Sequence, residues 1–290
     1  MEILKEDTGV SATPFLKWAG GKSQLIQSFE TRFPKAFGTY YEPFLGGGAV
    51  FFHLVRTNRI TRARLSDSNA DLVDCYLTIK DDLGGLSSIL RDFQRRVKSH
   101  EEFYSARKRF NEIRRHASIK NRTERSALLI YLNRTCYNGL YRVNAKGEFN
   151  VPFGKYKNPR VYDEKNLVAV NRVLNMPSIS VLHRDYHSMA DEPKRGDFVY
   201  FDPPYFPISK TANFTSYTAV DFTWDDQRAL SRLFNILAGR GCNVMLSNSP
   251  RVRELYEGYD YRIEVVKAGR AISSIGTKRG PVDELLVRNY

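Results

Sequence analysis

The sequence predicts an α/β fold, in which a largely parallel β-sheet flanked by helices is interrupted by a basic, mainly helical insertion. Three observations lead to this prediction. Near both ends of the chain, short apolar runs alternate with helical stretches, which is the pattern of βαβ units. From about residue 72 to 131, apolar residues recur at helical spacing between charged ones. The same middle part carries almost all of the net positive charge.

The first βαβ unit is expected near the N-terminus. Residues 40–44 should form a strand, the glycines that follow a turn, residues 49–56 a helix and residues 62–66 a second strand. A helical stretch is expected ahead of them, over about residues 23–33. Residues 133–159 lose the periodicity and are rich in Asn, Gly, Tyr, Arg and Pro, which indicates a hairpin-bearing loop rather than core. Later strands are expected at 179–182, 198–201, 244–247, 261–266 and 284–287.

The 290-residue chain is long enough for one large domain or two modest ones, and 42% hydrophobic residues exclude a disordered chain. No apolar run could cross a bilayer, and residues 1–10 do not resemble a signal peptide. Cys75, Cys136 and Cys242 are far apart, so neither a zinc site nor a disulfide framework is expected. We therefore expect no metal, no membrane association and a reducing, cytoplasmic setting.

Residues 91–160 concentrate the positive charge. They hold 18 Lys and Arg against 6 Asp and Glu, a net of +12, whereas the whole chain carries +13. The rest of the chain is thus almost neutral. Such a concentration favours a polyanionic partner, and the alternative is a solvated helical surface.

A glycine-rich turn follows the first expected strand. Gly46 and Gly48 allow the backbone to approach a ligand closely and to adopt positive φ. Asp67 lies 21 residues after Gly46, at the end of the next strand, where an acid often binds ribose hydroxyls. Glu42, beside the turn, could face a cationic group of the ligand. The alternative is an ordinary tight turn, because Phe51 breaks the dinucleotide motif G-x-G-x-x-G.

Gly21, Lys22 and Ser23 look like the end of a phosphate-binding loop. That motif needs a glycine where this chain has Leu16, and no convincing strand precedes it. We therefore do not expect an NTPase.

The most specific motif is Asp202-Pro203-Pro204-Tyr205, which closes the apolar strand expected at 198–201. The motif contains the groups needed to alkylate an aromatic amine, such as the exocyclic amine of adenine. That amine is a poor nucleophile because its lone pair is delocalised into the ring. Asp202 offers a carboxylate acceptor for its N–H groups and Pro203 a carbonyl that the prolines fix in place, which favours a more localised lone pair. Tyr205 can stack on the base. The alternative is a proline-rich turn with a buried tyrosine.

These motifs resemble those of a known family. The chain contains, in order, FLKWAGGK, EPFLGGGAVF, SDSNADL, LNRTCYNGLYRVNAKGEFNVPFGKY, DPPY, TANFTSY and VDELL. This set is similar to that of the Dam family of adenine-specific DNA methyltransferases, D12 class, alpha group. The resemblance implies a Rossmann-like S-adenosylmethionine-dependent methyltransferase sheet with a mainly helical DNA-recognition insertion. Residues 1–75 and 161–290 would form the catalytic and cofactor-binding domain, and residues 76–160 the target-recognition insertion.

The resemblance implies a site-specific enzyme that transfers a methyl group from S-adenosylmethionine to N6 of adenine in double-stranded DNA. The target site would be GATC, and the adenine would be flipped out of the duplex to reach the pocket. We see no sign of an obligate protein partner. The catalytic residues implied are Asp202, Pro203, Pro204 and Tyr205. The cofactor-binding residues implied are Trp18, Gly20, Lys22, Glu42, Phe44, Gly46, Gly48, Asp67, Asp185, Tyr186 and Asp202, of which Asp185 and Tyr186 would flank the adenine of the cofactor.

The DNA-binding residues implied are Lys17, Tyr137, Asn138, Leu140, Arg142, Pro152, Lys155 and Tyr156. Tyr137 and Asn138 look like the residues that wedge into the duplex, at an unstacking cost of a few kcal/mol. Leu140 and Pro152 suit contact with a thymine methyl, and Arg142 suits bidentate pairing with a guanine, with Lys17 and Tyr156 as candidates for the other guanine. Lys155 stands where some relatives carry Arg, and it would contact either a phosphate or a base.

Two other functions stay open at this point. One is a methyltransferase acting on RNA or on a protein amide, although relatives that modify protein glutamine usually have Asn in place of Asp202. The other is a non-catalytic DNA-binding protein, which the intact acids at Glu42, Asp67 and Asp202 argue against. Binding of S-adenosylmethionine would separate it from an enzyme.

Overall fold

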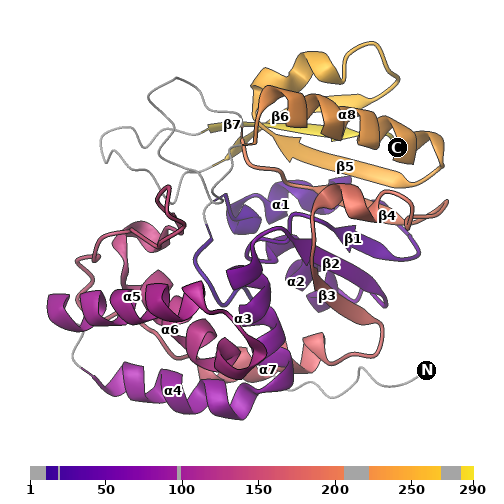
Figure 1. Ribbon diagram of the computed structural model, residues 1–290. Coiled ribbons are helices and arrows are strands. Elements are labelled where there is room, and N and C mark those ends of the chain that lie inside the picture. The colour runs from indigo at the N-terminus through magenta and orange to yellow at the C-terminus, as the bar shows by residue number, and fades with distance from the viewer. Residues whose placement is uncertain (1–10, 19, 97–98, 206–221, 269–281) are drawn as a thin grey trace.

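The computed structural model describes residues 11–18, 20–96, 99–205, 222–268 and 282–290. Within these residues, seven strands form one sheet in the order β3-β2-β1-β4-β5-β7-β6 (Figure 1). Strands β1 to β5 are all parallel to one another. Strand β7 is antiparallel to both of its neighbours, β5 and β6. The strands are β1 (Tyr40–Glu42), β2 (Ala63–Asp67), β3 (Ile179–His183), β4 (Phe198–Phe201), β5 (Asn243–Asn248), β6 (Arg262–Ala268) and β7 (Val282–Arg288).

The helices of the described residues are divided between the sheet and a separate group. That group, α4, α5 and α6, lies away from the strands (Figure 1). It is joined to the sheet through α3, which packs on β2 and β3 as well as on α6. The α-helices are α1 (Ile26–Phe29), α2 (Ala49–Arg56), α3 (Ala70–Asp81), α4 (Leu83–Arg95), α5 (His100–Arg115), α6 (Arg122–Thr135), α7 (Glu164–Leu174) and α8 (Trp224–Gly239).

Both faces of the sheet are buried. Along β4, Phe198 and Tyr200 belong to a core shared with α2, α3 and α7, whereas Val199 and Phe201 belong to a second core shared with α8. Alternate side chains of a strand point to opposite faces, so four consecutive apolar residues are needed to fill both cores. This explains why the strands appear in the sequence as short continuous apolar runs.

All seven expected strands are present, and so are the helix expected at residues 49–56 and the mainly helical character of residues 72–131. The sheet is mixed rather than wholly parallel, because β6 and β7 form an antiparallel pair beside β5.

The helical stretch expected at residues 23–33 is present, although it is not one continuous α-helix. That stretch consists of η1 (Lys22–Gln24), α1 and η2 (Glu30–Arg32), and it ends where Phe33 turns extended ahead of Pro34. A residue before proline disfavours the helical conformation, which accounts for the end.

The loop at residues 133–159 contains the expected hairpin contacts, with antiparallel bridges between Cys136 and Phe153 and between Val143 and Phe149. The expectation that it lies outside the core is wrong in part. Tyr141 and Phe149 are buried, and the ring of Phe149 packs against Phe110 of α5 at 6.1 Å. Because these apolar side chains are interleaved with polar ones, the composition of the loop did not indicate their burial.

Candidate active site

The strand order reverses between β1 and β4, since β2 and β3 extend the sheet from one side of this pair and β5 from the other. In open α/β sheets, ligands bind at the carboxyl ends of strands beside such a reversal. Three acids lie at these ends: Glu42 is the last residue of β1, Asp67 is the last of β2, and Asp202 directly follows β4. Residues far apart in the sequence therefore meet at one edge of the sheet.

Asp202 is paired with a buried lysine. Lys22 Nζ lies 2.6 Å from Asp202 Oδ1, and the lysine side chain is only 3% exposed. Ser247 Oγ, from β5, donates to the same carboxylate oxygen at 3.2 Å. Lys22 also donates to the Gly20 carbonyl at 3.0 Å and to the Tyr205 hydroxyl at 3.2 Å. The DPPY motif is thus held by a residue that the resemblance assigns to the cofactor.

The electrostatics of this pair follow from burial and proximity. Burial favours neutral lysine, but the negative charges of Asp202 and Glu284 outweigh it, so the pKa of Lys22 lies well above its usual value. Burial raises the pKa of Asp202, while the ammonium of Lys22 and the hydrogen bond from Ser247 oppose the rise. Lys22 is therefore a fixed positive charge at neutral pH, and it favours the ionised form of Asp202.

Glu284 completes this cluster, and sequence reasoning missed it apart from its place in VDELL. It lies on β7 and is 2% exposed. Its Oε1 lies 3.4 Å from Lys22 Nζ, and its Oε2 accepts a hydrogen bond from the Tyr205 hydroxyl. The signal that could have identified it is an acid inside the apolar run that ends the chain, since unpaired acids are almost never fully buried.

Pro203, Pro204 and Tyr205 follow Asp202 in an extended segment. Pro203 is buried, and the Pro204 carbonyl accepts from Gln227 of α8 at 3.1 Å. Tyr205 is 38% exposed, although its hydroxyl contacts both Lys22 and Glu284. The hydroxyl is anchored and much of the side chain faces outward.

The glycine turn and Asp67 are in direct contact. The Gly46 amide donates to Asp67 Oδ2 at 2.9 Å, and the Asn69 amide donates to Oδ1 at 2.9 Å. Gly48 has a φ of 70°, and a Cβ there would lie 2.8 Å from the Tyr76 hydroxyl. Glycine is thus required at this position both by conformation and by space.

Glu42 is buried next to the turn. Its Oε2 accepts from the Tyr40 hydroxyl at 2.9 Å. Burial raises the pKa of Glu42 well above its usual range, and the hydrogen bond from Tyr40 only partly offsets this. A buried acid of this kind favours a nearby cationic group.

The remaining residues that the resemblance assigns to the cofactor lie around these acids or beside them. Trp18 lies against Gly46 and stacks on Tyr141, with ring centroids 5.4 Å apart. The rings of Phe44 and Tyr186 are 5.1 Å apart, and Tyr186 is buried in the second core. Asp185 is exposed and accepts from the His187 amide at 2.9 Å at the start of η5 (Tyr186–Met189).

Lys17, one of the residues assigned to DNA, is held against the loop after α6 by hydrogen bonds. Asn133 accepts from the Lys17 amide at 2.8 Å and donates to the carbonyls of Lys17 and Gly139 at 2.7 and 2.9 Å. The ammonium of Lys17 lies 4.2 Å from the centre of the Tyr156 ring. Gly139 has a φ of 64°, and a Cβ there would lie 2.5 Å from that of Lys17.

The other residues assigned to DNA lie along the same loop. Tyr137 is exposed, and Asn138 adopts the left-handed conformation with a φ of 55°. Arg142 is half-buried and donates from Nε to Asn150 Oδ1 at 2.7 Å, which fixes the plane of its guanidinium. Leu140 is partly buried against the core, whereas Pro152 and Lys155 are exposed.

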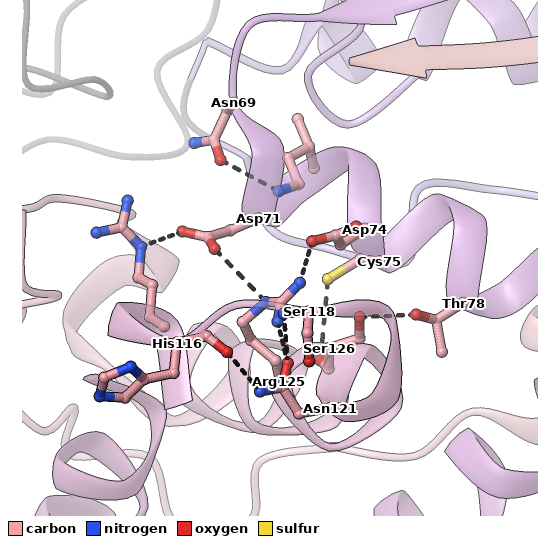
Figure 2. A network of polar contacts seen from close by, with 12 residues as sticks. Asn69, Asp71, Asp74, Cys75, Thr78, His116, Ser118, Asn121, Arg125 and Ser126 are labelled. Carbon is pink, nitrogen blue, oxygen red and sulfur yellow. Dashed lines mark hydrogen bonds and ion pairs between the residues drawn. The ribbon is translucent and has the colours of Figure 1, made fainter. Parts of the chain in front are cut away.

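A buried polar network links α3 to α5, α6 and the loop. Asp71 of α3 accepts from Arg114 Nε and from the Tyr141 hydroxyl, each at 2.6 Å. Arg125 of α6 contacts Asp74 and Asn121, and its Nε lies 4.0 Å from Asp71 (Figure 2). The helix that begins just after Asp67 therefore also positions the loop.

Metal-binding groups, membrane-spanning helices and disulfides were searched for within the described residues. There, no group of His, Cys, Asp and Glu side chains is arranged to hold a metal ion, and no helix is long and apolar enough to cross a membrane. Cys75, Cys136 and Cys242 are buried and form no disulfide. The segment TANFTSY, residues 211–217, lies outside the described residues.

The fold and these acids define an α/β enzyme with its site at the carboxyl edge of the sheet, and comparison with known proteins identifies its class. A model of the D12 class N6 adenine-specific DNA methyltransferases matches residues 18–272. The chain is 43% identical to the type II methyltransferase M.MjaIII of Methanocaldococcus jannaschii, over 96% of this chain and 99% of that protein. It is 38% identical to the type II methyltransferase M1.LlaDCHI of Lactococcus lactis subsp. cremoris, over 100% and 99%. It is 36% identical to the DNA adenine methylase of Escherichia coli K12, over 94% and 93%.

The chain therefore belongs to the D12 class of N6 adenine-specific DNA methyltransferases, and the resemblance stated from its motifs is confirmed.

Proposed function

We propose that this enzyme transfers the methyl group of S-adenosylmethionine to N6 of adenine within GATC in double-stranded DNA, after flipping the adenine out of the duplex. The observation that carries the proposal is the placement of Asp202, Glu42 and Asp67 at the carboxyl ends of three parallel strands beside the reversal in strand order. These acids suit a ligand with cationic groups and hydroxyls, next to an aromatic amine.

The residues at the strand ends fit S-adenosylmethionine, which would supply a methyl group on positively charged sulfur. Asp67 keeps acceptor capacity for ribose hydroxyls, because a carboxylate has about four lone-pair sites and two backbone amides occupy only two. Glu42 is a buried acid that a cationic group would help to keep ionised. Gly46 and Gly48 leave the turn without side chains, so the backbone is open to close approach. Trp18, Gly20, Lys22, Phe44, Asp185 and Tyr186 complete the proposed set.

Asp202 and Pro203 are the acceptors that we propose for the amine. Asp202 accepts one N–H of the amine and the Pro203 carbonyl accepts another, which localises the lone pair on nitrogen. The negative charge of Asp202 offsets the positive charge that develops there. Tyr205 is exposed enough to stack on the flipped base. A base within a duplex has no access to such a site, so flipping is part of the proposal.

For recognition, we propose residues 76–160 as the DNA-binding insertion and residues 1–75 and 161–290 as the catalytic part. The excess of 12 positive charges in residues 91–160 suits the phosphate backbone. Exposed Tyr137 suits a wedge in the duplex, together with Asn138. Arg142, aimed by Asn150, suits a guanine edge. Lys17, Leu140, Pro152, Lys155 and Tyr156 complete the proposed contact set. We place the enzyme in the cytoplasm, because its buried cysteines are unpaired.

The test is methylation of an unmodified plasmid with tritiated S-adenosylmethionine, followed by sequencing that maps the methylated adenines. Label confined to GATC adenines supports the proposal, with Asp202→Ala as the inactive control. Methylation of adenines outside GATC refutes the specificity, and the absence of label with this cofactor refutes the donor. For flipping, 2-aminopurine in place of the target adenine should brighten on binding, and unchanged fluorescence would contradict it.

A further inference from the structure

A partly buried carboxylate, that of Asp202, and a buried one, that of Glu284, share one ammonium in the active site. Lys22 Nζ lies 2.6 Å from Asp202 Oδ1 and 3.4 Å from Glu284 Oε1. Glu284 is almost fully buried, and its Oε1 has no hydrogen-bond partner within the described residues. Burying an acid is costly unless it is paired, so the placement of Glu284 calls for an explanation. Its only close cation in the described structure is already committed to Asp202.

We propose that Glu284 is a positioning residue for methyl transfer. It attracts the ammonium of Lys22, so that the charge of Asp202 is only partly neutralised, and it fixes the ring of Tyr205. The inference rests on the proposed function, in which Asp202 accepts from the target amine. Glu284 comes from β7, at the opposite end of the chain from Lys22, so only the completed sheet brings the two together.

The first part of the inference follows from the charges. One positive and two negative charges lie together, so the ammonium is divided between Asp202 and Glu284. Within the described ranges, both partners of Asp202, Lys22 and Ser247, contact Oδ1. Oδ2 is thus left to accept from the amine. Without the charge of Glu284, Lys22 is attracted by Asp202 alone, and the carboxylate becomes a weaker acceptor for the substrate.

The second part concerns Tyr205. Its hydroxyl donates to Glu284 and accepts from Lys22, and Lys22 Nζ lies 5.1 Å from the centre of the ring. The side chain is 38% exposed, so contacts at the hydroxyl end limit the orientation of a ring that is otherwise open on one side. Removing the acceptor on Glu284 frees that end and loosens the surface on which the base stacks.

The test compares three variants. Glu284→Gln keeps the size and an acceptor for Tyr205 but removes the charge, whereas Glu284→Leu removes both. Asp283→Asn is the matched control, because it makes the same charge change at the neighbouring, exposed position of β7. Each protein is tested for its single-turnover methylation rate, its affinity for S-adenosylhomocysteine, its affinity for duplex and its thermal unfolding.

We expect Glu284→Gln to lower the single-turnover rate about 10- to 100-fold, the range found for outer groups that orient a reactive one. Both affinities should stay within about twofold of wild type, and Asp283→Asn should match wild type throughout. Glu284→Leu should also change the fluorescence of bound 2-aminopurine at the target position, which Glu284→Gln should leave as in wild type. That difference reports the ring of Tyr205 rather than general stability.

A wild-type rate in Glu284→Gln overturns the proposal. So does a loss of rate matched by equal losses of analogue affinity and thermal stability, since that pattern marks a purely structural role. The substrate is a duplex carrying whichever site the wild-type enzyme methylates. A target other than GATC would therefore refute the proposed specificity and leave this test unchanged.

Discussion

Replacing Asp71 with alanine should destabilise the protein and disconnect the proposed recognition loop, residues 133–159, from the sheet. Asp71 is buried on α3 and accepts from Arg114 Nε and the Tyr141 hydroxyl, each at 2.6 Å, with Arg125 Nε 4.0 Å away. Figure 2 shows Arg125 between Asp71, Asp74 and Asn121. One carboxylate thus joins α3, α5, α6 and the loop.

The magnitude follows from what each partner loses. The hydroxyl of buried Tyr141 loses its acceptor, which costs about 1–3 kcal/mol. Arg125 is 4% exposed and keeps Asp74 and Asn121, so it pays only part of the ~3–5 kcal/mol typical of a broken buried pair. Arg114 is 30% exposed, so water compensates most of its loss. We expect Asp71→Ala to lower the free energy of unfolding by about 3 kcal/mol and Asp71→Asn, which keeps an acceptor, by about 1 kcal/mol.

The assay is urea unfolding at neutral pH, with the free energy taken from the midpoint at unchanged slope. Asp81→Ala is the control on the same helix, because Asp81 is 47% exposed and its pair with Arg122 should contribute less than about 1 kcal/mol. An Asp71→Ala midpoint equal to that of Asp81→Ala would refute the reasoning, since the buried network would then contribute no more than a surface pair.

Four further outcomes are expected. Asp202→Ala should slow single-turnover methylation at least about 100-fold, through loss of the acceptor and its charge, and leave duplex binding largely intact; turnover within tenfold of wild type would contradict its role. Duplex affinity should fall steeply from low to physiological salt because residues 91–160 release counterions, and a flat affinity in a salt titration would contradict this. Arg142→Ala should lower methylation of GATC far more than that of sites altered at one guanine-bearing pair; an equal loss on every one-base variant would make Arg142 a phosphate contact. Because burial raises the pKa of Glu42, the contribution of Glu42 to the stability of the ligand-free protein should be largest below the ordinary glutamate pKa and be lost as pH rises through the raised value; in urea unfolding measured across pH, the difference between wild type and Glu42→Gln should follow that change, and a difference that does not vary with pH would contradict it.

The strands and the glycine turn could be predicted because their signals are local. An apolar run of four or five residues is sufficient to identify a strand buried on both faces, as at β4. The spacing of 21 residues between Gly46 and Asp67 predicted a shared site, and the Gly46 amide does donate to Asp67. The DPPY motif predicted a site at the end of a strand, and β4 ends directly before it.

The contacts between distant segments could not be predicted in the same way. Lys22 and Glu284 are separated by most of the chain, and their proximity depends on β7 being inserted between β5 and β6. Tyr141 lies in a loop rich in polar residues, yet it contacts both Trp18 and Asp71. No periodicity or spacing in the sequence indicates these contacts, because they arise only from the packing of completed elements.

One short stretch of backbone connects the two halves of the proposed chemistry. Lys17 is held by Asn133 beside the recognition loop, and Lys22, five positions on, is held by Asp202. Trp18, between them, stacks on Tyr141 of the loop and lies against Gly46 of the turn. The N-terminal segment therefore contacts the loop at residues 133–159, the glycine turn and Asp202, and it links these three parts of the fold through the side chains of Lys17, Trp18 and Lys22.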